Sequence, residues 1–100
     1  MPIVHIVLCK LKPNGSEAQI AELRAAGESM VGAIPGLQTF KMGPPLAITA
    51  QRAKGFDMAV YTVLDTEKDL LAYAGHPAHL QIHHLRLPLV EDTLVYDMEI

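Results

Sequence analysis

The stretch IVHIVLCKLK, residues 3–12, decides how this chain folds. It is rich in β-branched residues and stops at Pro13-Asn14-Gly15, so it is predicted to be a β-strand that ends in a turn. Its side chains alternate between two faces, and both faces are apolar in the middle of the strand. Strands with two apolar faces are usually buried on both sides, so we expect both faces of this strand to be covered.

A helix is predicted after this turn. Ser16 and Gln19 form a capping box, in which the Ser16 hydroxyl accepts a hydrogen bond from a free backbone amide and the Gln19 side chain reaches back. Apolar residues then recur at helical spacing, and Pro35-Gly36 ends the helix. The apolar stripe consists of Ile20, Leu23, Gly27, Met30, Val31 and Ile34.

Three further strands are predicted from runs of apolar and β-branched residues. They cover residues 37–43, 55–64 and 93–100. Residues 46–54 show no clear pattern and are expected to form a loop.

A second helical region lies between the third and fourth strands. Asp65 or Thr66 is predicted to cap it, and it breaks at Gly75-His76. Pro77 suits the first residue of a new helical turn, because its missing amide hydrogen would have no partner there.

The order β-α-β-β-α-β predicts an α+β fold of the ferredoxin-like type in a single domain, residues 1–100. One antiparallel four-stranded sheet would carry the helices on one of its faces. The other face would stay open, with one apolar side of the first strand on it. Because a large exposed apolar patch usually marks an interface, we expect a homodimer through the open sheet face.

Composition narrows the class of protein. The formal net charge is −3 and the basic residues do not cluster, so no nucleic-acid partner is expected. No apolar run reaches membrane-spanning length, and the N-terminus resembles a strand more than a signal peptide. Cys9 is the only cysteine, which predicts a buried, unreactive thiol. A soluble cytoplasmic protein is the expectation.

Histidines concentrate in residues 73–84, which hold four of the five in the chain. His76, His79 and His83 are spaced three and then four residues apart, which would align three imidazoles on one continuous helix as metal ligands. Pro77, however, puts His76 at or before the helix start, and no acidic residue or cysteine is spaced to complete the set. We therefore expect no metal site here.

Several short motifs occur together along the chain. They are His5 within VHIVL, the sequence IPG at residues 34–36, KGFD at 54–57, Tyr73 three residues before HPAH at 76–79, and DTLVYD at 92–97. Together they resemble the stress-responsive dimeric A/B barrel (Dabb) family over nearly the whole chain, and the spaced HPAH is the most specific of them. The family fold is a dimeric α+β barrel, in agreement with the topology predicted above.

The resemblance also implies a site. A plant polyketide cyclase of this family closes a linear poly-β-ketone by intramolecular aldol condensation, without metal or organic cofactor. This chain is similar to it at His5, Tyr73 and His79, which implies that His79 is the general base and Tyr73 its hydrogen-bonding partner. It departs from it at Met58, where the cyclase has a pocket histidine, and in the first helix, which lacks the cyclase's aromatic lining. The substrate therefore does not carry over.

These residue types suit an aldol closure. A histidine with a pKa near neutrality can take a proton from carbon, and a tyrosine hydroxyl can donate a hydrogen bond to the developing oxyanion. The positive end of a helix dipole at about the third residue of the helix would keep His79 neutral. The spacing of Tyr73 and His79 does not decide whether they meet, and His5 points either toward the helices or toward a partner sheet.

Two functions stay open at this point. In the first, the chain is a cofactor-free enzyme that uses His79, Tyr73 and His5 in an apolar pocket to cyclise, condense or eliminate an enolisable, polyketide-like small molecule. In the second, it is a non-enzymatic stress-response dimer. His5 would then be a satisfied core histidine, His79 a hydrogen-bonded residue under a helix start, and Tyr73 a core side chain.

Overall fold

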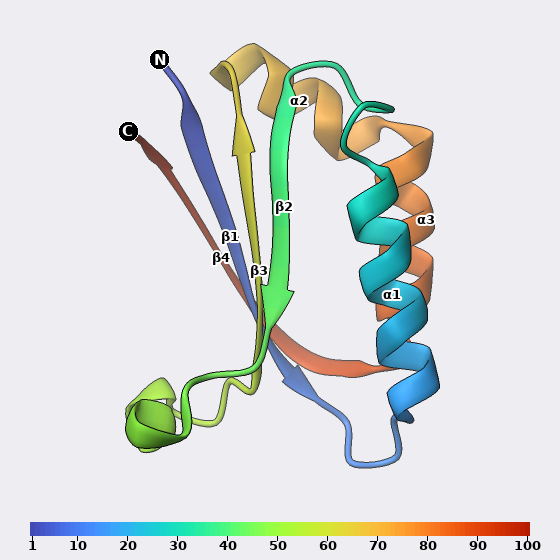
Figure 1. Cartoon of the computed structure of the whole chain (residues 1–100), viewed down its shortest axis with the longest axis vertical. Helices are drawn as coiled ribbons and strands as arrows, with labels where there is room; N and C mark the ends of the chain where they lie inside the picture. Colours follow the sequence, from blue (N-terminus) through green and yellow to red (C-terminus); the bar gives the residue numbers. More distant parts are fainter.

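A four-stranded sheet carries three α-helices on one of its faces (Figure 1). The computed structural model describes residues 1–100. In chain order the elements are β1 (Ile3–Leu11), α1 (Glu17–Ser29), β2 (Leu37–Gly43), the short 3₁₀ helix η1 (Ala47–Ala53), β3 (Met58–Leu64), α2 (Glu67–Gly75), α3 (Pro77–Arg86) and β4 (Val90–Glu99). None of the helices is long and apolar enough to cross a membrane.

The strands follow the order β2-β3-β1-β4, and each neighbouring pair is antiparallel. This arrangement confirms the ferredoxin-like fold predicted from the sequence. The central strand β1 pairs with β3 on one side and β4 on the other, so that His5 lies opposite Thr62 and Asp97. The two apolar faces of β1 therefore belong to an interior strand of the sheet.

The helices begin where the sequence provides signals, but α1 ends at Ser29, before the predicted end at Pro35-Gly36. The chain leaves the helix in turns that include Gly32 with φ of 91°, so Val31 is exposed and does not continue the apolar stripe.

At the start of α1, the Gln19 amide donates to the Ser16 hydroxyl over 3.1 Å, and the Ser16 amide donates to the Gln19 side chain over 2.9 Å, which confirms the capping box. Thr66 caps α2 by accepting from the Asp69 amide. The break at His76 produces two separate helices, α2 and α3.

Some boundaries differ from the sequence prediction. Residues 46–54 were expected to form a loop, but η1 occupies most of this segment and ends where Lys54 adopts a left-handed conformation with φ of 56°. The third strand begins at Met58, because the preceding Asp57 instead binds the end of β1, where its carboxylate accepts from the Leu11 amide over 2.8 Å. β4 starts three residues earlier than predicted, at Val90.

The core lies between the sheet and the helices. α1 packs closely against the sheet because Gly27 has no side chain and Phe40 fills the space beside it. A Cβ atom on Gly27 would lie 2.0 Å from the Cζ atom of the Phe40 ring. The three α-helices and the end of α1 contribute buried side chains to this core, among them Leu23, Met30, Tyr73 and Ile82.

The opposite face of the sheet carries no helix, and we call it the open face. Side chains alternate along each strand, so the residues on it are those that point away from the helices. β2 contributes Thr39 and Lys41 to it, and its apolar members are Val4, Ile6, Leu8, Ala59, Val63, Tyr61, Leu94, Tyr96 and Met98. The last four of these are between 39% and 59% exposed, which makes the open face an apolar surface of the kind predicted.

Candidate functional site

Tyr73 and His79 meet across the break between α2 and α3. Tyr73 lies in the last turn of α2 and is buried, and His79 is the third residue of α3. Their ring centroids are 4.4 Å apart. His76 makes the break possible: its Nδ1 accepts a hydrogen bond from the Ala78 amide over 3.1 Å and so caps α3. The two residues that spacing alone could not place together are therefore neighbours.

One hydrogen bond fixes the tautomer of His79. Its Nδ1 lies 3.1 Å from the carbonyl oxygen of Ala74, and because a carbonyl only accepts, Nδ1 carries the proton. In a continuous helix this carbonyl would accept from the amide of Ala78, but that amide donates to His76 instead. The neutral ring therefore has its lone pair on Nε2, which makes no hydrogen bond within the chain.

His5 points toward the helices and joins the same cluster. Its ring centroid lies 5.5 Å from that of Tyr73. Its Nδ1 lies 2.5 Å from a carboxylate oxygen of Asp97 on β4, and this is the only ion pair in the chain. The sequence analysis did not find Asp97, because its place beside His5 depends on the antiparallel register of β1 and β4.

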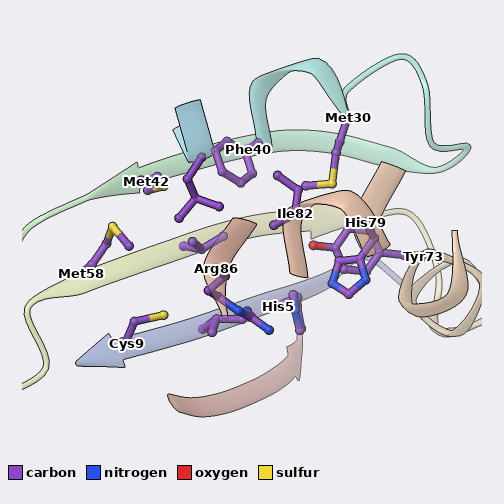
Figure 2. Close-up of a pocket in the computed structure, with 13 residues that line it drawn as sticks. His5, Cys9, Met30, Phe40, Met42, Met58, Tyr73, His79, Ile82 and Arg86 are labelled. Carbon is purple, nitrogen blue, oxygen red and sulfur yellow. The ribbon is translucent and has the colours of Figure 1, made fainter. Parts of the chain in front are cut away.

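These three side chains line one small cavity between the sheet and the helices (Figure 2). Its volume is about 20 Å³, which is room for roughly one water molecule. Arg86 is the fourth polar residue of the wall. The remaining walls are apolar and come from Val7, Cys9, Leu23, Met30, Phe40, Met42, Met58, Val60 and Ile82.

Burial controls the protonation of the two central groups. It lowers the pKa of His79 below its ordinary value of 6.5, and the nearby cationic side chain of Arg86 and the imidazoles of His5 and His83 lower it further, while the hydrogen bond to Ala74 opposes the shift. Burial also raises the pKa of Tyr73 to about 12, against a smaller opposing effect of Arg86. At neutral pH the site therefore holds a neutral imidazole beside a protonated phenol.

This direction for His79 agrees with the sequence prediction, but the physical cause differs. The helix dipole was expected to keep the ring neutral, whereas removal from water is the largest cause. Cys9, which also lines the cavity, is fully buried, and burial raises the pKa of its thiol. Because the thiolate is the reactive form of cysteine, a raised pKa agrees with the unreactive thiol that the sequence predicts.

Sequence reasoning missed Arg86, the last residue of α3. Its half-buried side chain extends from α3 toward β1 (Figure 2). A signal for it existed: His79, Ile82 and Arg86 are spaced three and then four residues apart, which places all three on one face of a helix. One face of α3 thus carries the candidate base His79, the apolar side chain of Ile82 and the cationic side chain of Arg86.

The other histidines make separate contacts. His76 caps α3, and the Nδ1 atom of His83 lies 3.2 Å from the Arg86 guanidinium. His84 is exposed. No group of three or more histidine, cysteine or acidic side chains is placed to hold a metal ion.

Comparisons with known proteins agree with this fold. The chain is 24% identical over 96 residues to the stress-response A/B barrel domain-containing protein HS1 of Arabidopsis thaliana, which covers 96% of this chain and 87% of that protein. A dimeric ferredoxin-like protein of unknown function from Thermobifida fusca superposes with a TM-score of 0.84 at 27% identity, covering 100% of this chain and 92% of the other.

A second solved structure belongs to an enzyme. The hydroxynitrile lyase of Passiflora edulis superposes with a TM-score of 0.87 at 25% identity, covering 99% of this chain and 93% of that one. The profile of the stress responsive A/B barrel domain family matches residues 3–100. This match spans every element of the fold and every residue of the candidate site, and the chain belongs to the stress responsive A/B barrel domain family, abbreviated Dabb.

Proposed function

We propose that this chain is a cofactor-independent acid–base enzyme in which His79 is the general base and Tyr73 the hydrogen-bond donor. The observation that carries this proposal is that the ring of His79, with Nε2 free, packs against the ring of Tyr73, whose hydroxyl stays protonated, and both line one largely apolar cavity. A neutral imidazole accepts a proton readily, and water exclusion strengthens the hydrogen bond from the phenol to a developing negative charge.

In the proposed reaction, Nε2 of His79 takes a proton from a carbon next to a carbonyl group. The electron pair of the broken C–H bond moves to the carbonyl oxygen, where the Tyr73 hydroxyl donates to the oxyanion. The resulting enolate then attacks a second carbonyl, within the same molecule or in another, or expels a leaving group. The imidazolium of His79 gives its proton to the alkoxide that forms or to the departing group. His5, oriented by Asp97, is a secondary polar group beside Tyr73.

The cavity favours a small reacting group. A volume of about 20 Å³ is room for roughly one water molecule, so a carbonyl oxygen can enter it but a linear poly-β-ketone cannot. A larger substrate would have to displace the flexible thioether side chains of Met30, Met42 and Met58. Lyase chemistry gains support from the similarity to a hydroxynitrile lyase. In the cleavage of a hydroxynitrile a base takes the hydroxyl proton, the electron pair of that O–H bond forms the carbonyl, and the C–C bond to the nitrile breaks with loss of cyanide, which then takes the proton from the base.

The proposal can be tested with two direct assays. Proton NMR in D₂O would follow hydrogen–deuterium exchange next to the carbonyl of small ketones, and absorbance would follow aldehyde release from mandelonitrile. We expect His79→Ala to reduce any rate by roughly 10²- to 10⁴-fold, and Tyr73→Phe to reduce it by a smaller factor. His84→Ala, at an exposed histidine, is the control. If both site variants fold and keep the wild-type rate, these residues are not the catalytic pair.

A second candidate function is the non-enzymatic stress-response dimer. Two observations favour it: the cavity is small, and no buried side-chain nitrogen or oxygen lacks a hydrogen-bond partner. In this alternative His79 and His5 serve the fold, through Ala74 and Asp97. It predicts that His79→Ala lowers stability and changes no reaction.

We also propose that the chain forms a homodimer through the open face. Solved relatives such as the Thermobifida fusca protein are dimeric, and a second copy would cover Tyr61, Leu94, Tyr96 and Met98. Two sheets packed face to face would then form the α+β barrel that the family name describes.

A further inference from the structure

Arg86 lies where the closed cavity adjoins a larger, open hollow. It lines the cavity of about 20 Å³ that holds His79 and Tyr73. It also lines a solvent-open hollow of about 290 Å³ between the end of α3 and the start of β4. The other residues of this hollow are His83, Leu87, Val90, Glu91, Asp92 and Thr93. Arg86 therefore forms part of the wall of both the closed cavity and the open hollow.

The guanidinium of Arg86 has no carboxylate partner. The only acid–base contact within 4.0 Å in the chain joins His5 to Asp97, and the one hydrogen bond of the Arg86 side chain goes to Nδ1 of His83 over 3.2 Å. Its other donors are accessible to solvent, since no buried side-chain nitrogen or oxygen in the chain lacks a partner. They are therefore free to bind an anion that enters the open hollow.

We propose that Arg86 binds the carboxylate of a small keto acid, which would lie in the open hollow while the ketone reaches into the closed cavity. The planar guanidinium can bind a carboxylate through two parallel hydrogen bonds. This inference rests on the proposed function, because that function is the reason to expect a ketone in the closed cavity. It also accounts for the small cavity, which then holds only the reacting end of the substrate.

The charges around Arg86 narrow the class of acid. Glu91 and Asp92 also line the open hollow, and they would repel a second negative charge on the ligand. Arg86 also binds His83, and Cys9, Tyr73 and His79 face it from the closed cavity, but none of these groups carries a negative charge near neutral pH. We therefore expect a monocarboxylate to bind better than a dicarboxylate of similar length.

A bound carboxylate would also act on His79. The positive charge of Arg86 lowers the pKa of His79, and a carboxylate placed on the guanidinium would offset that charge. The pKa of His79 should therefore rise when a keto acid binds. A methyl ester of the same acid, which carries no charge, should leave it unchanged.

The test is a binding measurement and does not need turnover. ¹⁵N-labelled protein would be titrated by NMR with pyruvate, acetoacetate and levulinate, and with their methyl esters. We expect the wild type to prefer at least one acid over its ester, and Arg86→Gln to weaken binding of that acid by roughly 10- to 100-fold without affecting the ester. Arg86→Lys should keep part of the preference. Lys68→Gln, an equal charge change at an exposed site, is the control.

The outcomes separate the two proposals. Equal binding of acid and ester, no binding of any probe, or an unchanged preference in a folded Arg86→Gln variant would overturn the role of Arg86. Acid-selective binding that needs Arg86 and survives in His79→Ala would support it, even if no turnover is found. Absence of turnover with bound acid would instead count against the acid–base proposal alone.

Discussion

At the scale of single residues, some members of the candidate site could be predicted from the sequence, whereas others depend on contacts that only the fold creates. His5, Tyr73 and His79 were named from the sequence, and all three line one cavity. Asp97 was quoted only as the end of the DTLVYD motif, because its contact with His5, 92 residues away in the chain, depends on the register of β1 and β4. The free Nε2 of His79 likewise depends on a carbonyl released by the helix break.

The protonation of His79 gives a prediction for the pH dependence of any activity. Its pKa lies below 6.5 because burial disfavours the imidazolium, and only the neutral ring can accept a proton. We expect kcat/KM to fall on the acid side below pH 6.5 and to stay level above it. Since the pKa of Tyr73 is about 12, loss of its proton should not limit activity near neutrality. A pH–rate profile with its acid limb above pH 7 would contradict this assignment.

At the scale of elements, the helix break is the feature that sequence described best. Pro77 was predicted to start a helical turn and His76 to lie at or before that start, and the structure confirms both, with His76 as the N-cap. The short helix η1 was missed because 3₁₀ turns need no apolar periodicity and leave little trace in a sequence. The close approach of α1 to β2 was missed as well, because it depends on which strand residue faces Gly27.

Gly27 gives a prediction at this scale. A methyl group there would collide with the buried ring of Phe40, so we expect Gly27→Ala to destabilise the fold by about 1–3 kcal/mol, despite the better helix propensity of alanine. Chemical denaturation would measure the change. Gly75→Ala is the matched control, because a Cβ there meets nothing within 4 Å. Adding Phe40→Leu should recover part of the loss, and a neutral Gly27→Ala would show that α1 can move away from β2.

At the scale of the whole molecule, topology was the most predictable property. The sequence predicted six elements in the order β-α-β-β-α-β, and the ferredoxin-like fold is the common architecture for that order. The sheet order β2-β3-β1-β4 confirms it. Assembly is harder to derive, because a patch of exposed apolar residues does not state what covers it. The homodimer through the open face stays a prediction that rests on that patch and on dimeric relatives.

Sedimentation would test this dimer. The wild type should be a dimer at micromolar concentration, and Tyr96→Glu should shift it toward monomer, because a carboxylate buried in an apolar interface loses its hydration. Leu71→Glu is the control: Leu71 is 72% exposed but lies on α2, away from the open face. A wild type that stays monomeric at micromolar concentration would contradict the prediction, and so would a Tyr96→Glu variant that remains dimeric.

The alternation of side chains along β4 carries one more consequence. Asp97 faces the helices and holds His5, while its neighbours Tyr96 and Met98 face the other way, on the open face. A second copy packed against those neighbours would restrict the motion of β4, and it would thereby restrict the Asp97 carboxylate that orients His5. Self-association and the state of the site would then be thermodynamically linked. The rate per chain would fall on dilution, and the cell could set the activity of each copy through the abundance of the protein alone.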